Sequence, residues 1–214
     1  MLKAGLRPIL NPMREIVFDT ETTGFDPKNG DRMVEMGCVE MVNRVETGAT
    51  YHAYYNPERD MPAAAEGVHG LSSAFLSDKP LFRDTAAELL DFIGDAPLVA
   101  HNASFDRNVL EKSLGYYNIP LPDMDWDCTY QATGLKLLEA CDQNKIKLDN
   151  HHDSAFDATA CAKLYLGLTE YTNPRSTVSN KKDYSQYSDR KLSKDILKKD
   201  LSSADPSSFF YDKK

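Results

Sequence analysis

Two carboxylates stand one residue apart near the start of the chain, at Asp19 and Glu21 in the run Ile-Val-Phe-Asp-Thr-Glu-Thr-Thr-Gly over 16–24. The apolar residues before them predict a β-strand, in which side chains two residues apart point to the same face. Both carboxylates would then meet at the end of that strand, where their mutual repulsion favours a cation between them. Mg²⁺ and similar hard ions prefer such oxygen ligands. The pair therefore indicates a metal site, although an acidic surface strand would have the same signature.

A second acidic motif follows a short apolar run at 97–100, which predicts a buried strand. It reads His-Asn-Ala-Ser-Phe-Asp over 101–106. Asn102 or Ser104 would cap the next helix, because short polar side chains accept hydrogen bonds from the first free N–H groups of a helix. Asp106 would then lie in the first helical turn, near the edge of the sheet.

A third motif, His-His-Asp-Ser-Ala-Phe-Asp over 151–157, opens the last predicted helix. His152 and Asp157 are five residues apart, which is about 140° around a helix, so they cannot share a helical face. We therefore expect Asp153 or Ser154 to cap the helix and His152 to precede it on a mobile loop. Any one of these acids is explained by the favourable charge of a helix start. All of them together indicate one site.

The elements that position these motifs alternate along residues 14–170. Strands are predicted at 15–19, 32–43, 45–54, 97–100 and 126–130, and helices at 84–94, 104–114, 135–141 and 154–168. The first helix would be capped by Asp84, bury Ala87, Leu90 and Ile93, and end at Gly94. Three strands in series followed by strand–helix alternation predict an α/β fold with a mixed sheet and helices on both faces.

Composition narrows the class of protein. The 214 residues carry a net charge of −8 and include 41% hydrophobic residues, which suits one globular domain. No apolar run approaches the length of a membrane span, and the first residues do not resemble a secretory signal. The four cysteines form no Cys-x-x-Cys pair, which predicts free thiols in a reducing cytoplasm and no zinc site. The acidic charge disfavours a basic nucleic-acid grip but suits phosphate binding through metal ions.

Three segments differ in composition. Residues 1–13 are predicted to be a flexible lead-in, and residues 14–172 a catalytic domain. Residues 173–214 contain nine Ser, ten basic and six acidic residues, and so carry +4, against −12 for the first 172 residues. This composition predicts a flexible tail, suited to a linker toward a partner or a further module.

Taken in order, these motifs resemble those of the DEDDh 3′–5′ exonucleases, and most of all the epsilon proofreading subunits of bacterial replicative DNA polymerases. The resemblance is carried by the segments IVFDTETTG (16–24), GVHGLSSAFLSDKPLF (67–82), VAHNASFDRNVL (99–110) and HDSAFD (152–157). It implies a ribonuclease H-like sheet of five strands. It also implies two Mg²⁺ or Mn²⁺ ions held by Asp19, Glu21, Asp106 and Asp157, with Asp19 between the two ions.

The resemblance further assigns His152 as the general base, because its spacing to Asp157 is the one that the family uses. The unperturbed pKa of histidine, near 6.5, suits proton transfer from water at neutral pH. His151 is the alternative base. Candidate substrate contacts are Thr22, Thr23, Val68, His69, Asn102 and Phe105.

Each substrate contact has an expected role. Backbone N–H groups of Thr22 and Thr23 would bind the terminal 3′-hydroxyl, and His69 would flank the terminal nucleotide. Phe25, Val68 and Phe105 would offer apolar surface for stacking with bases, an arrangement that tolerates any sequence. Packing in the core explains Phe105 equally well.

The sequence thus predicts a metal-dependent exonuclease that releases nucleoside 5′-monophosphates from single-stranded or frayed DNA 3′ ends, in replication proofreading or repair. A polymerase, clamp or fused module would bind through the tail. An exoribonuclease of the same family is the main alternative, since the pocket around a 2′-hydroxyl cannot be derived from sequence. A catalytically silent scaffold would have no need for four convergent carboxylates. A phosphatase for small phosphoesters would have no use for the segments at 67–70 and 101–106.

Overall fold

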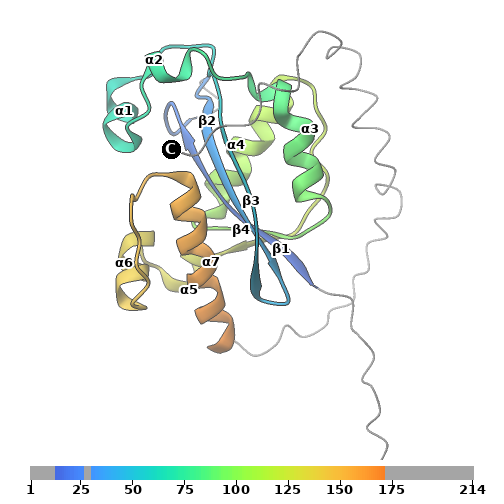
Figure 1. Cartoon of the computed structure of the whole chain (residues 1–214), viewed down its shortest axis with the longest axis vertical. Coiled ribbons are helices and arrows are strands. Elements are labelled where there is room, and N and C mark those ends of the chain that lie inside the picture. The colour runs from blue at the N-terminus through green and yellow to red at the C-terminus, as the bar shows by residue number, and fades with distance from the viewer. Residues whose placement is uncertain (1–12, 27–29, 172–214) are drawn as a thin grey trace, which may run out of the picture.

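A mixed sheet forms the centre of the computed structural model, which describes residues 13–26 and 30–171 (Figure 1). Its strands are β1 (Arg14–Thr22), β2 (Met33–Val42), β3 (Val45–Tyr54), β4 (Leu98–Ala100) and β5 (Trp126–Cys128), in the spatial order β3-β2-β1-β4-β5. β2 lies antiparallel to β1 and β3, whereas β4 runs parallel to β1 and β5. The predicted five-stranded mixed sheet is therefore confirmed.

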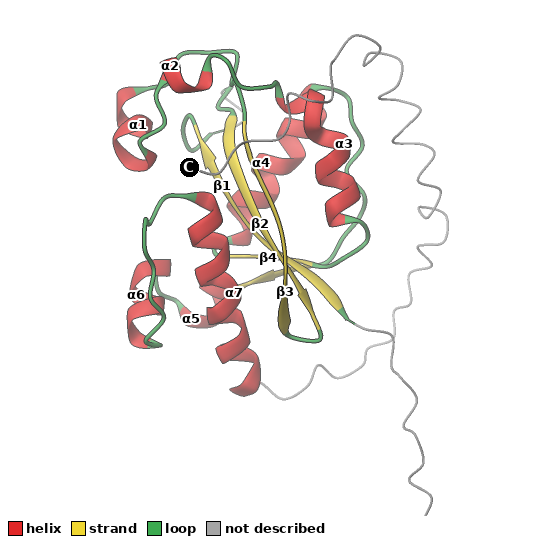
Figure 2. Ribbon diagram, in the orientation of Figure 1, coloured by secondary structure: helices red, strands yellow, loops and turns green. Residues whose placement is uncertain are grey.

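Helices cover both faces of this sheet (Figure 2). They are α1 (Ala63–His69), α2 (Ser73–Leu76), α3 (Phe82–Ile93), α4 (Ala103–Tyr116), α5 (Thr129–Thr133), α6 (Leu137–Gln143) and α7 (Ser154–Tyr171). α3 and α4 pack on one face, and α6 and α7 pack on the other. The predicted covering of both faces is thus confirmed, and α7 extends beyond the predicted end at residue 168.

The alternation of side chains along β1 decides which face each catalytic candidate occupies. Ile16 and Phe18 enter the core shared with α3 and α4, whereas Val17 enters the core shared with α6 and α7. Asp19 and Glu21 are in phase with Val17, because residues two apart on a strand point to the same face. Both carboxylates therefore lie on the side of α7.

Several predicted elements differ in their bounds, and α3, β5 and α6 show the local causes. Asp84 is not the first cap of α3: the helix begins at Phe82, and the Asp84 side chain instead accepts a hydrogen bond from the Leu81 N–H at 3.2 Å. The face of α3 that packs on the sheet buries Phe82, Thr85, Ala86, Leu89 and Ile93, so the predicted burial is correct for Ile93, whereas Ala87 and Leu90 are only half-buried.

The two later differences have local causes. The strand expected over 126–130 ends at Cys128, whose sulfur accepts a hydrogen bond from the Gln131 N–H, so that α5 begins at Thr129. The helix expected from residue 135 begins at Leu137, after an extended Lys136.

The predicted tail at 173–214 and nearly all of the lead-in lie outside the described residues. Within 13–26 and 30–171, no helix combines the length and the apolar character that a membrane crossing requires.

Candidate active site

The N-terminus of α7 rests directly on the sheet beside the end of β1. The contact is made at Gly37 of β2, whose Cα pairs with Asp19. A Cβ at Gly37 would lie 2.4 Å from the carbonyl carbon and oxygen of Ser154, so only glycine allows this approach. The first turn of α7, which carries Asp157, is thereby held against Asp19.

Three carboxylates converge at this contact. Asp19, Glu21 and Asp157 each offer an oxygen within 4.8 Å of the others. Asp106 approaches from the first turn of α4, where it is 2% exposed. Its Oδ1 accepts a hydrogen bond from the Thr20 hydroxyl at 2.8 Å, which holds the Asp106 carboxylate close enough for its charge to raise the pKa of Asp19. Side chains from three separate segments thus meet at one end of the sheet.

Burial and mutual repulsion disturb the ionisation of these acids. Burial, followed by the charges of Glu35, Asp157 and Asp106, raises the pKa of Glu21 to about 9. The pKa of Asp19 is raised well above its usual value by burial and by the neighbouring carboxylates, with Asp106 the largest of these. Burial raises the pKa of Asp106 to about 7, although the Thr20 hydroxyl opposes this shift. Buried acids that resist ionisation favour a divalent cation, and their oxygens suit Mg²⁺ or Mn²⁺.

Two neighbouring histidines border the carboxylates. Nδ1 of His151 lies 3.0 and 3.1 Å from the two oxygens of Asp157, and the backbone N–H of His152 donates to Asp157 Oδ2 at 3.0 Å. Nδ1 of His152 lies 3.8 Å from Glu21 Oε1. Burial and the charge of His151 lower the pKa of His152, which favours its neutral form.

The loop before α7 has the predicted cap. Asp153 Oδ1 accepts hydrogen bonds from the N–H groups of Ala155 and Phe156, at 3.1 and 3.3 Å. His152 stands one residue earlier with a φ of 72°. A positive φ is uncommon outside glycine, although histidine adopts it more often than most residues. It sets the position of the His152 ring beside Glu21.

One expected substrate contact is wrong in this structure. The backbone N–H of Thr23 already donates to the Arg32 carbonyl at 2.8 Å, so it is not free for a 3′-hydroxyl. The cause is an irregularity in the β1–β2 pairing between Glu21 and Thr22, which turns the end of β1 toward Arg32. Both threonine side chains are buried, and the Thr22 hydroxyl donates to the Gly24 carbonyl.

His69 lies next to Thr22 from the end of α1. Its Nδ1 accepts a hydrogen bond from the Leu71 N–H at 3.1 Å, so the ring proton belongs to Nε2. That nitrogen donates to the Thr22 carbonyl at 3.2 Å. Burial lowers the pKa of His69, which is consistent with a neutral ring. The structure therefore brings His69 to the end of β1.

The remaining substrate candidates lie at the surface, except that Phe105 is half-buried and also packs against the core, as the alternative prediction for it required. Phe25 is 87% exposed, and its ring centroid lies 6.3 Å from that of the half-buried Phe105. Val68 is 47% exposed. Asn102 is exposed at the N-cap position of α4, but its side chain makes no capping hydrogen bond. The predicted side-chain cap of this helix is therefore wrong, because a φ of 67° is not the extended backbone that a capping residue adopts.

Residues that the sequence did not suggest also support the site. Glu35 of β2 is opposite Glu21 and only 1% exposed, and its Oε1 lies 2.6 Å from Nε2 of His52. The sequence signal for Glu35 was an acid within a mostly apolar strand, because a buried acid requires a polar or charged partner. Thr20 gave no such signal, since its hydrogen bond to Asp106 joins residues 86 positions apart.

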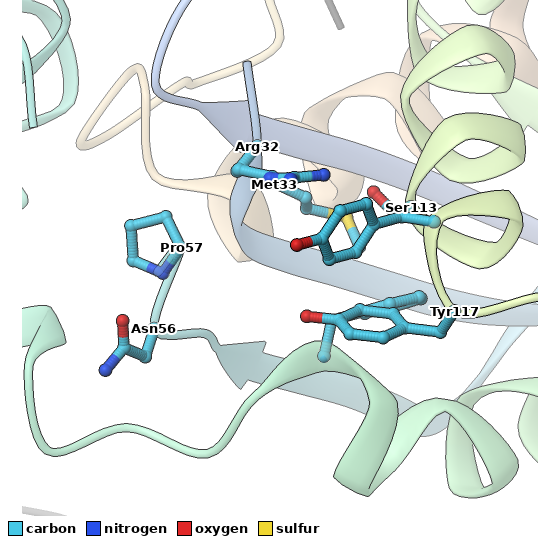
Figure 3. Close-up of a pocket in the computed structure, with 8 residues that line it drawn as sticks. Arg32, Met33, Asn56, Pro57, Ser113 and Tyr117 are labelled. Atoms are coloured by element: carbon cyan, nitrogen blue, oxygen red, sulfur yellow. The ribbon is translucent and has the colours of Figure 1, made fainter. Parts of the chain in front are cut away.

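A separate shallow hollow, open to solvent, is shown in Figure 3. It is lined by Arg32, Met33, Asn56, Pro57, Phe82, Ser113, Tyr116 and Tyr117. The Arg32 guanidinium lies 3.5 Å from the centre of the Tyr116 ring. None of the four candidate carboxylates lines this hollow. The candidate active site is therefore identified by its cluster of carboxylates and not by this hollow.

Fold and site together define a class: an α/β nuclease with acidic residues at the end of its central strand. A family model described as Exonuclease matches residues 16–165. The chain belongs to this exonuclease family. Within the family it is one of the DEDDh 3′–5′ exonucleases related to the epsilon subunit of bacterial DNA polymerase III.

Curated relatives carry this name. The DNA polymerase III subunit epsilon of Rickettsia felis is 40% identical over 173 residues, which cover 75% of this chain and 76% of that protein. The subunit of the same name from Salmonella typhimurium is 35% identical over 173 residues, covering 73% and 71%.

Solved structures share the fold. Exonuclease X in complex with 5′ overhanging duplex DNA has a TM-score of 0.60 at 23% identity, over 74% of this chain and 92% of that one. The nuclease domain of 3′hExo, a DEDDh family member bound to rAMP, has a TM-score of 0.65 at 14% identity, over 75% and 94%.

Proposed function

We propose that this chain removes nucleotides from the 3′ end of single-stranded or frayed DNA and releases nucleoside 5′-monophosphates. The observation that carries the proposal is the convergence of Asp19, Glu21 and Asp157 within 4.8 Å, with Asp106 buried beside them. The curated relatives named as DNA polymerase III epsilon subunits support DNA as the substrate, and replication proofreading or repair as the process.

In this proposal Asp19, Glu21, Asp106 and Asp157 would hold two Mg²⁺ or Mn²⁺ ions. When bound, such a pair activates water and neutralises charge on the phosphate that is attacked. The raised pKa values of Glu21 and Asp106 fit this role, because acids that repel one another bind a cation readily. Asp157 is kept in place by the His152 N–H and by Nδ1 of His151.

His152 is the proposed proton acceptor. Its lowered pKa keeps the ring neutral at neutral pH, as a general base requires. Its side chain is 42% exposed and lies beside Glu21, so it is open to water and to substrate. His151 is the weaker candidate because its Nδ1 is already occupied by Asp157.

The candidates at and near the surface supply the proposed substrate contacts. Phe25 and Phe105 present aromatic surface to unpaired bases, and Val68 presents an apolar edge. His69 and Asn102 would flank the terminal nucleotide, and the Thr22 N–H is the remaining backbone candidate for the 3′-hydroxyl. We assign these contacts to residues 14–172 as one exonuclease domain.

Residues 173–214 are the proposed tether to a polymerase, a clamp or a fused module. The domain is acidic, so it has little long-range attraction for DNA, and a basic tail would supply contact with a partner. Deleting 173–214 should leave the hydrolysis of short oligonucleotides intact; a large loss on such substrates would refute this role. All four cysteines are free, which supports a reducing cytoplasm as the location.

The test of the function uses 5′-labelled single-stranded DNA and RNA of equal sequence, incubated with Mg²⁺ or Mn²⁺. The proposal predicts a ladder that shortens from the 3′ end of the DNA and disappears with chelator or in the Asp157→Ala variant. Faster shortening of the RNA would instead establish the exoribonuclease alternative. No cleavage of either polymer with either metal would refute both.

A further inference from the structure

A second group of potential metal ligands overlaps the first at Asp157. His151, His152 and Asp157 each offer a ligand atom, and all three atoms lie within 4.8 Å of one another. The Asp157 carboxylate also belongs to the group with Asp19 and Glu21. One side chain is thus shared between a group of three carboxylates and a group with two imidazoles.

The two groups differ in chemistry. Carboxylate oxygens alone suit Mg²⁺ and Mn²⁺, whereas imidazole nitrogens suit Zn²⁺ and neighbouring transition ions. Zn²⁺ binds histidine nitrogen and carboxylate oxygen at about 2.0–2.2 Å in a tetrahedral arrangement, which places neighbouring donor atoms about 3.3 Å apart. Nδ1 of His151 lies 3.0 and 3.1 Å from the two oxygens of Asp157, close to that spacing.

The rest of the geometry allows an ion to enter. The rings of His151 and His152 are stacked, with centroids 3.9 Å apart, and their ligand nitrogens lie within 4.8 Å of each other, so a rotation of the rings would turn both lone pairs toward one ion. The His151 side chain is 30% exposed and that of His152 is 42% exposed, which leaves room for water to complete the coordination. The backbone N–H of His152 continues to orient Asp157 from behind.

We propose that His151, His152 and Asp157 form a site for Zn²⁺ or a similar transition ion, which overlaps the site for the catalytic metal at Asp157. His151, which lies outside the His-x4-Asp motif, creates this site by adding a second nitrogen. When the ion binds, Nδ1 of His151 gives its proton to water and Nε2 of the same ring takes a proton from water, so the ring stays neutral. The ion then replaces the hydrogen bond between His151 and Asp157.

Occupation of this site inhibits the reaction of the proposed function. The ion withdraws Asp157 from the group with Asp19 and Glu21, and it holds the nitrogen of His152 that would accept a proton. The binding itself depends only on the three side chains. It can therefore be tested without any assumption about the substrate.

The binding test titrates Zn²⁺ by calorimetry, and Co²⁺ by visible absorption, into the metal-free full chain in the presence of Mg²⁺. Co²⁺ is a spectroscopic substitute whose colour reports nitrogen ligands in a site of low coordination number. We expect one ion per chain, and at least a tenfold weaker binding in both His151→Gln and His151→Leu. A tenfold change corresponds to about 1.4 kcal/mol.

The matched control is His52→Gln, because Glu35, His52 and Asp153 form another group with atoms within 4.8 Å. Binding that is unchanged in His52→Gln and weakened in both His151 variants supports the proposal. Binding that persists in both His151 variants, or that is lost in His52→Gln, overturns it. Absence of Zn²⁺ binding by the unmodified chain also overturns it.

A second experiment measures inhibition at fixed Mg²⁺, with each variant normalised to its own rate without Zn²⁺. We expect the half-inhibiting Zn²⁺ concentration to rise at least tenfold in His151→Gln. An unchanged value, with binding weakened, overturns the inhibitory role. If no variant cleaves DNA, the proposed function fails, while the binding experiment still decides whether the metal site exists.

Discussion

Replacing Glu21 by glutamine should stabilise the metal-free protein at pH 8 even though the proposed reaction requires this acid. The cause is the ionisation of Glu21, whose pKa rises from 4.5 to about 9 on folding through burial and neighbouring carboxylates. At pH 8 the folded chain must hold a proton on Glu21 that the unfolded chain does not bind. Because the pKa of Glu21 is higher in the folded chain, the protein is most stable below pH 4.5, where Glu21 is protonated in both states. The free energy of unfolding then falls as the pH rises from 4.5 toward 9.

The size of this effect can be worked out in two ways. Each pH unit above the unfolded pKa costs about 1.4 kcal/mol, so the cost at pH 8 reaches about 5 kcal/mol. The carboxylates lie within 4.8 Å of one another, and at that limit two of them repel by about 3.5 kcal/mol at an effective dielectric constant of about 20. Glutamine removes the charge while keeping the shape. We expect a gain of about 3 kcal/mol, or roughly 6–12 °C in the melting temperature of a domain this size.

Thermal melts followed by circular dichroism in EDTA provide the assay, at pH 5 and pH 8. The gain of Glu21→Gln should be large at pH 8 and close to zero at pH 5, where the proton costs less than about 1 kcal/mol. Mg²⁺ should raise the melting temperature of the unmodified protein and reduce the difference. The control is Glu88→Gln, at an exposed acid of α3, which should change little. Equal melting temperatures at pH 8, or a gain that does not depend on pH, would refute the electrostatic account.

Three further substitutions test other contacts. Gly37→Ala should cost about 1–3 kcal/mol in urea unfolding, because its Cβ would overlap the Ser154 carbonyl; unchanged stability would show that α7 does not rest there. Thr20→Val should lower the free energy of unfolding by about 1–3 kcal/mol, because it removes the hydrogen bond to Asp106. It should also raise the pKa of Asp106 further and so shift the dependence of the hydrolysis rate on pH to higher pH. An unshifted pH dependence would show that Thr20 does not control the ionisation of Asp106. His152→Gln should lower kcat about 10²–10⁴-fold with Mn²⁺ binding retained, and a near-normal kcat would exclude it as the base.

The sheet and its covering helices were predictable because their signals are local. The apolar run in β1 and the apolar run at 98–100 each define a strand without reference to distant residues. That Asp19 and Glu21 share a face followed from the two-residue period of a strand. The helix cap at Asp153 could also be predicted from the sequence, because its hydrogen bonds join residues two and three positions apart.

Contacts between distant segments were not predictable from the sequence. The role of Gly37 depends on where α7 crosses β2, and the hydrogen bond between Thr20 and Asp106 depends on how α4 meets β1. The expectation for Thr23 was wrong because an irregular strand pairing gave its N–H to Arg32, a detail that no local pattern encodes.

The central claim is that the carboxylates at the end of β1 hold the metal that drives hydrolysis from a DNA 3′ end. The most direct measurement follows the shortening of 5′-labelled single-stranded DNA by the unmodified chain and by Asp19→Asn as Mn²⁺ is added. The account predicts stepwise loss from the 3′ end that rises with Mn²⁺ in the unmodified chain and is absent in Asp19→Asn. Cleavage by Asp19→Asn at a similar rate, or cleavage that begins inside the strand or at its 5′ end, would contradict it.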